Sequence, residues 1–337
     1  MKVLQYIYLG IGLALLVAAV WAFDFEAALG LVGNIGLLSF LAVMAVVLFM
    51  QLLDSLTWQL TIPSLRMTHL PSAARIWMVR MVCEAFNRVI PAGTLGGEPL
   101  KAVLLKRTCA VGYREGLASL YTIRMLDLAG QFLFVLCTSA VILFADPIAP
   151  SYKISIGLGI LVMCAMLASL LLLPRSRLSA RIKRFLHLRG WGARSIEALS
   201  HIEDIEDRIV KFRRRLPHRF YGALTLSAAN YALGSVELYL TYWALGHPIN
   251  IAEAVMIEAV LQLVRTVTFF IPGNLGSQEG AYVLFGVALT GTAASVGLGA
   301  AIVRRLRELV VLLLGFAIGA AMSVPPRAKI PVRMPDR

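Results

Sequence analysis

Long apolar stretches make up most of this chain, and polar residues gather in a few short segments between them. Six of the apolar stretches are long enough to cross a hydrocarbon layer of ~30 Å as helices: about 3–23, 35–60, 116–144, 153–173, 220–245 and 297–323. Two others, 76–106 and 253–291, are broken near their middles by proline and glycine. The pattern predicts an all-α polytopic membrane protein, with residues 1–337 forming a single integral membrane domain.

Composition and charge agree with this prediction and indicate an orientation. The chain is 59% hydrophobic and only 15% charged. Its most basic segments are 174–219, with 13 Lys and Arg against 5 Asp and Glu, and the tail 324–337. Short basic loops stay in the cytoplasm, so both termini are expected there. Because most of the excess positive charge lies beside membrane helices, anionic headgroups explain it and no nucleic-acid partner is expected.

The two interrupted segments share a pattern. Their turns read IPAGTLGGE and IPGNLGSQE, so that Pro91 to Glu98 and Pro272 to Glu279 are both seven residues apart. One shift of 181 residues also places Arg124 on Arg305, and the acid three residues after each arginine on its counterpart. This agreement predicts an internal repeat with copies at about 35–145 and 216–326.

Each interrupted segment is predicted to be a re-entrant helical hairpin. The residues that break the helix at the turns are Pro91, Gly93, Gly96, Gly97, Pro272, Gly273 and Gly276. Since the single crossing 153–173 separates the copies, the copies should be inverted, and their hairpins should enter from opposite faces. Inverted repeats with broken helices are typical of transporters, whose sites lie where those helices meet. The alternative is that each turn is only a packing kink.

Charged residues inside the apolar segments are the candidates for such a site, because charge at membrane depth has to face a partner or a cavity. Arginine suits a phosphate and a carboxylate suits an amine. The candidate substrate-binding residues are Glu98, Arg124, Glu279, Arg305, Arg80, Arg88, Arg265 and Arg304. Glu84, Asp127 and Glu308 lie three or four residues from an arginine and are expected to form charge pairs. Glu98 and Glu279 could instead cap their helices.

No metal-ligand spacing, P-loop or catalytic triad occurs in the sequence, so no metal, cofactor or catalytic residue is assigned. Within the basic loop, the apolar spacing of 196–212 predicts an amphipathic helix along the membrane surface or under the bundle.

Four segments resemble the flippase-like transmembrane region of the lysylphosphatidylglycerol synthases, a family that includes stand-alone hopanoid-associated membrane proteins. They are NRVIPAGTLGGEPLKAVLLKR (87–107), RMLDLAG (124–130), FFIPGNLGSQEGAYVLFGVALTG (269–291) and RRLRELVVLLLG (304–315). The resemblance implies a lipid flippase of the bacterial inner membrane, whose substrate is an aminoacylated phospholipid, a hopanoid or a polyprenyl-linked lipid. The soluble aminoacyl-transferase domain of the synthases is not expected here, so only the flipping half is implied.

Two other functions remain open at this point. A membrane-embedded enzyme acting on a lipid headgroup could use Glu98 and Glu279 as acid and base. An accessory subunit of lipid biosynthesis would need neither the glutamates nor the arginines. Membrane lipids are the expected partners, and lipid-biosynthesis enzymes and a second copy of the chain are further candidates.

Overall fold

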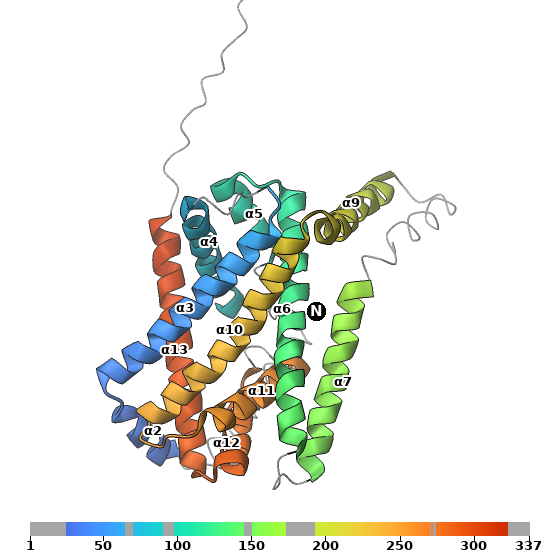
Figure 1. Ribbon diagram of the computed structural model, residues 1–337. Helices are drawn as coiled ribbons and strands as arrows, with labels where there is room; N and C mark the ends of the chain where they lie inside the picture. The colour runs from blue at the N-terminus through green and yellow to red at the C-terminus, as the bar shows by residue number, and fades with distance from the viewer. Residues whose placement is uncertain are drawn as a thin grey trace, which may run out of the picture.

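Helices account for the regular structure of the chain in the computed structural model, which describes residues 25–64, 70–89, 98–144, 150–172, 193–269, 271 and 274–322 (Figure 1). No strand occurs within these ranges, and the all-helical prediction is confirmed. The helices are α2 (Phe25–Gly33), α3 (Leu37–Thr61), α4 (Leu70–Val89), α5 (Glu98–Cys109), α6 (Tyr113–Phe144), α7 (Pro150–Leu172), α9 (Ala193–Arg215), α10 (Pro217–Ala244), α11 (Ile251–Val267), α12 (Ser277–Thr290) and α13 (Ala294–Ala321).

Five of the six expected crossings correspond to single helices, namely α3, α6, α7, α10 and α13. The sixth, 3–23, lies outside the described residues. By length and composition alone, α3 and the stretch Tyr113–Ser139 of α6 are apolar enough to span a membrane in the described part of the chain. Charged residues lower the apolarity of α10 and α13, so the total number of crossings stays a prediction.

Each interrupted segment forms a pair of shorter helices, α4 with α5 and α11 with α12. The second break has a local cause: Gly276, just before α12, has a φ of 77°, and this left-handed region favours glycine. The helix then begins with the side chain of Glu279 accepting a hydrogen bond from the Gly276 N–H at 2.8 Å. In the first segment, residues 90–97 lie outside the described part of the chain.

The helix bounds recur along the chain. The starts of α4 and α11, the starts of α6 and α13, and the ends of α5 and α12 are each 181 residues apart. In Figure 1, α3 and α10 cross side by side and run in opposite directions, as α6 and α13 do. The pair α4 and α5 lies at the end of the molecule that carries α9, and the pair α11 and α12 lies at the other end.

The helices pack closely where small residues allow it. Helix α3 packs on α10, α4 packs on α13, and α11 packs on α6. Gly315 of α13 lies directly against the backbone of Met81 in α4, and Gly130 of α6 lies against Ser227 of α10. Any larger side chain at these positions would push the helices apart, so the glycines set the distance between them.

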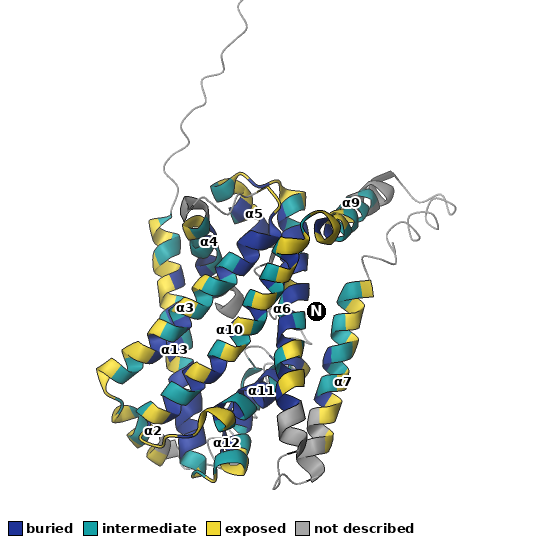
Figure 2. Cartoon of the chain, viewed as in Figure 1, coloured by how far each residue is buried: buried dark blue, intermediate teal, exposed yellow. Residues whose placement is uncertain are grey.

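The outer faces of the bundle expose large apolar side chains, whereas the dark blue, buried residues face inward (Figure 2). Leu38 in α3 is 82% exposed and Ile154 in α7 is 72% exposed. A protein in water would bury such residues, but a hydrocarbon environment favours their exposure. This surface therefore fits a membrane protein.

Candidate functional site

The charged residues of the helices face the interior and gather in two clusters. We call the first the α13 cluster; it comprises Glu237, Glu258, Arg265, Glu279, Arg304, Arg305, Arg307 and Glu308. We call the second the α6 cluster; it comprises Asp54, Arg80, Arg124 and Asp127 with the polar residues Ser227 and Asn230. Helix α10 contributes to both clusters.

Glu279 and Arg305 are direct partners in the α13 cluster. The Oε1 atom of Glu279 lies 2.6 Å from Nε and from Nη2 of Arg305. The other carboxylate oxygen caps α12 by accepting the N–H of Gly276. The sequence analysis treats Glu279 and Arg305 as separate ligands for an amine and a phosphate. In the structure they neutralise each other, so a ligand at either residue has to compete with the pair.

Glu308 joins the two consecutive arginines of α13. Its Oε2 atom lies 3.0 Å from Nη1 of Arg305, and its Oε1 atom lies 3.3 Å from Nε of Arg304. The expected charge pair between Arg305 and Glu308 is therefore present. Arg304 also donates a hydrogen bond through Nη1 to the hydroxyl of Tyr282 at 3.2 Å. Helices α12 and α13 are thus connected through both arginines.

Arg307 forms the most deeply buried ion pair in the described part of the chain. Its Nη1 atom lies 3.0 Å from Oε2 of Glu237, and the two side chains are only 10% and 4% exposed. The pair connects α13 to α10. Buried pairs of this kind are costly to break, because the remaining charge loses its partner away from water.

Arg265 differs from the other arginines of the α13 cluster. Its Nη1 atom lies 3.7 Å from Oε1 of Glu258, and Glu258 also accepts a hydrogen bond from Gln262 at 2.5 Å. The Nε and Nη2 atoms of Arg265 are buried and have no hydrogen-bond partner among the described residues. Arg304 and Arg307 are close enough to interact with it electrostatically. Buried N–H groups without partners beside two further cations favour an anion at this position.

The α6 cluster is centred on Asp54 of α3. Its Oδ2 atom lies 2.5 Å from Nη2 of Arg80, and its Oδ1 atom accepts a hydrogen bond from Asn230 at 2.7 Å. Asp54 is absent from the candidates proposed from sequence, although a lone acid inside an apolar crossing was a usable signal. Arg80 was expected to share a helix face with Glu84. The structure adds a partner on another helix, because α3 packs against α4.

Arg124 and Asp127 belong to the same cluster. Asp127 accepts a hydrogen bond from Ser227 of α10 at 3.3 Å and interacts electrostatically with Arg80, Arg124 and Lys101. Lys101, which is buried, is a second residue that the sequence analysis missed. The hydroxyl of Tyr231 interacts with Asp54, Asp127, Arg124 and Arg265. It therefore lies between the two clusters and connects them.

Several candidate residues cannot be placed. The side chains of Arg88 and Glu98, and the turn residues Pro91, Gly93, Gly96, Gly97, Pro272 and Gly273, lie outside the described part of the chain. Within the described ranges, no group of three or more His, Cys, Asp or Glu side chains is arranged to hold a metal ion.

A bundle of helices with leucines outside and paired charges inside is an integral membrane protein of the polytopic α-helical class. The chain belongs to the family described as the lysylphosphatidylglycerol synthase TM region, whose model matches residues 7–315. This confirms the resemblance inferred from the four segments. The chain is also 27% identical over 252 residues to a UPF0104 membrane protein of Methanothermobacter thermautotrophicus, a match that covers 70% of each chain. No solved structure matches the chain.

Proposed function

We propose that this protein is a flippase or transporter that moves an amphiphilic lipid with a phosphate-bearing headgroup across the cytoplasmic membrane, with both termini in the cytoplasm. The observation that carries the proposal is Arg265, which has two buried N–H groups without partners among the described residues. Arg304 and Arg307 add positive charge beside it. A phosphate accepts hydrogen bonds from guanidinium groups in this geometry more favourably than any neutral group.

The proposed architecture is a pair of inverted repeats, at about 35–145 and 216–326. The helix bounds that recur at 181 residues and the opposite directions of α3 and α10 support it. Reciprocal packing supports it as well, since α4 packs on α13 where α11 packs on α6. Even a detail recurs: Gly116 faces the Cα atom of Ala102, and Gly297 faces the Cα atom of Val283 at the same offset.

Inverted repeats provide two similar arrangements of one site, which is how many transporters alternate their access. In this proposal the two charge clusters are the counterparts. Arg124 and Asp127 in the first correspond to Arg305 and Glu308 in the second. Tyr231 connects them, so a headgroup that leaves one cluster meets the polar groups of the other without crossing hydrocarbon. The lipid tails stay in the membrane throughout.

A transport assay in proteoliposomes tests the proposal. Phosphatidylglycerol carrying a fluorescent acyl label is placed in one leaflet, and its appearance in the other is followed with a membrane-impermeant quencher. Arg265→Gln should lower the rate to that of protein-free liposomes, because it removes the charge and the open donors together. Arg265→Lys keeps the charge without the guanidinium fork and should give an intermediate rate. Transport by Arg265→Gln at the wild-type rate refutes the proposed site.

Two controls complete the assay. Arg208→Gln changes an exposed arginine of α9 that pairs with Asp204 on its own helix, so its rate should match the wild type. The labelled lipid is then recovered and analysed by mass spectrometry. An unchanged headgroup is expected, whereas a modified one favours the alternative of a membrane-embedded enzyme acting on the headgroup.

A further inference from the structure

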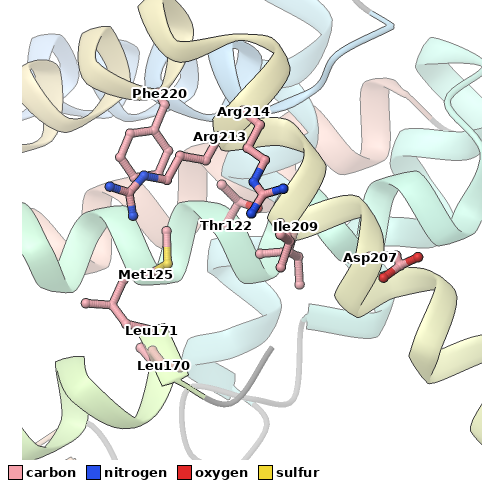
Figure 3. Close-up of a pocket in the computed structure, with 10 residues that line it drawn as sticks. Thr122, Met125, Leu170, Leu171, Asp207, Ile209, Arg213, Arg214 and Phe220 are labelled. Atoms are coloured by element: carbon pink, nitrogen blue, oxygen red, sulfur yellow. The ribbon is translucent and has the colours of Figure 1, made fainter. Parts of the chain in front are cut away.

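A pocket of about 600 Å³ lies where α9 meets α6, beside the end of α7 and the start of α10 (Figure 3). It is separate from both charge clusters, because none of its lining residues belongs to them. Its apolar part includes Met125, Leu170 and Leu171, and its basic part consists of Arg213 and Arg214. The volume is in the range of small-molecule sites and exceeds what a free phosphate ion fills.

The two parts of the pocket follow from the sequence of α9. Ile209 and Phe212 are buried, whereas the last turn carries three exposed arginines, Arg213 to Arg215. The helix therefore packs through its apolar side, as expected for an amphipathic helix, and leaves a basic edge. The C-terminal end of a helix also favours positive charge, which adds to the stability of this arrangement.

The charges of the pocket are complementary to an anion. Arg213 lies over the ring of Phe220, with its Cζ atom 5.5 Å from the ring centroid. Asp207 also lines the pocket, but its carboxylate lies 3.3 Å from the ammonium group of Lys211. Neither Arg213 nor Arg214 makes an ion pair within the described part of the chain. Two adjacent guanidinium groups beside an apolar surface suit a headgroup phosphate whose acyl chains continue into hydrocarbon.

We propose that this pocket binds an anionic phospholipid that is held rather than transported. Its phosphate lies on Arg213 and Arg214, and the upper part of an acyl chain lies on Met125 and Leu171. The end of the bundle that carries α9 is the basic one, and anionic lipids are enriched in the cytoplasmic leaflet that basic loops face. A lipid at this position links α9 to α6 and α7, and so fixes the amphipathic helix to the bundle.

Native mass spectrometry of the full chain, released from nanodiscs with equal amounts of phosphatidylglycerol and phosphatidylcholine, tests the proposal. The wild type should retain phosphatidylglycerol in preference to phosphatidylcholine. The double variant Arg213→Gln/Arg214→Gln should retain at least about tenfold less phosphatidylglycerol, because it loses both charged donors. Arg215→Gln is the matched control, since Arg215 does not line the pocket, and it should behave as the wild type. Equal retention by the double variant and the wild type overturns the proposal.

A second variant tests the apolar part without touching the charges. Leu171→Trp fills the space between α7 and α9 and should also reduce phosphatidylglycerol retention. Glycerol phosphate, which has the headgroup but no acyl chain, should bind far more weakly than the lipid. If glycerol phosphate binds as tightly, or if Leu171→Trp retains as much lipid as the wild type, the pocket is not a lipid site. Because no step of this experiment measures lipid movement, its outcome is independent of the proposed transport function.

Discussion

Glu279→Gln is the substitution that most directly separates the structural role of the α13 cluster from its proposed functional one. The carboxylate has two tasks, since one oxygen caps α12 through Gly276 and the other accepts two N–H groups of Arg305. A glutamine has a single acceptor oxygen. It can keep the cap, but its amide nitrogen then faces the guanidinium as a second donor, and the charge is lost.

The expected magnitude follows from burial. Removing one partner of a fully buried pair costs about 3–5 kcal/mol, and a hydrogen bond to a charged group contributes about 1.5–3 kcal/mol. The side chain of Glu279 is only 6% exposed, but that of Arg305 is 29% exposed and keeps Glu308 at 3.0 Å. We therefore expect Glu279→Gln to lower the free energy of unfolding by about 2 kcal/mol, which is roughly a thirtyfold change in the equilibrium constant.

A double-mutant cycle measures this value. Unfolding of Glu279→Gln, Arg305→Gln and the double variant is followed by circular dichroism as sodium dodecyl sulfate is added to mixed micelles. If the pair is real, the double variant should lose about 2 kcal/mol less than the sum of the single variants. Additive losses refute the pair. Glu253→Gln is the matched control, because Glu253 caps α11 in the same way at an exposed position, and it should cost clearly less.

The same variants also decide the functional role of Glu279. If the carboxylate only caps its helix and balances Arg305, Glu279→Gln protein that remains folded should move lipid at the wild-type rate. If the carboxylate binds a headgroup amine, the folded variant should show little transport. The transport rate is therefore measured only on protein whose circular dichroism matches the wild type.

Three further predictions concern other parts of the bundle. Gly297→Ala should destabilise the protein by about 1–3 kcal/mol, because a methyl group there would lie 2.7 Å from a backbone carbonyl oxygen, whereas the equivalent Gly116→Ala meets its nearest atom at 3.6 Å and should be close to neutral; equal thermal shifts would contradict this. Arg307→Gln should cost about 3–5 kcal/mol in the unfolding titration, since its pair with α10 is about nine-tenths buried, and a loss under 1 kcal/mol would mean that the pair contributes little. In a cysteine-free background, a cysteine at Arg208 should react with membrane-impermeant reagents only from the cytoplasmic side, and one at His247 only from the outside; reaction of both from one side would rule out the inverted arrangement.

Most of the helical framework could be predicted from the sequence alone. The described crossings agree with the predicted ranges within a few residues, because a helix in hydrocarbon satisfies its own backbone hydrogen bonds and needs only a sufficient apolar length. The break before α12 was also predictable, since it depends on glycine at Gly276. The pair between Arg305 and Glu308 was predictable for the same reason, because residues three apart lie on one face of a helix.

The partners between helices were decided by the tertiary structure. Asp54 meets Arg80, and Glu237 meets Arg307, only because α3 packs on α4 and α10 packs on α13. Local spacing cannot predict such pairs, since they depend on which faces of two helices meet and at what depth. The sequence determined that buried charges had to find partners. Packing determined which partners they found, and it left the open N–H groups of Arg265 at the centre of the α13 cluster.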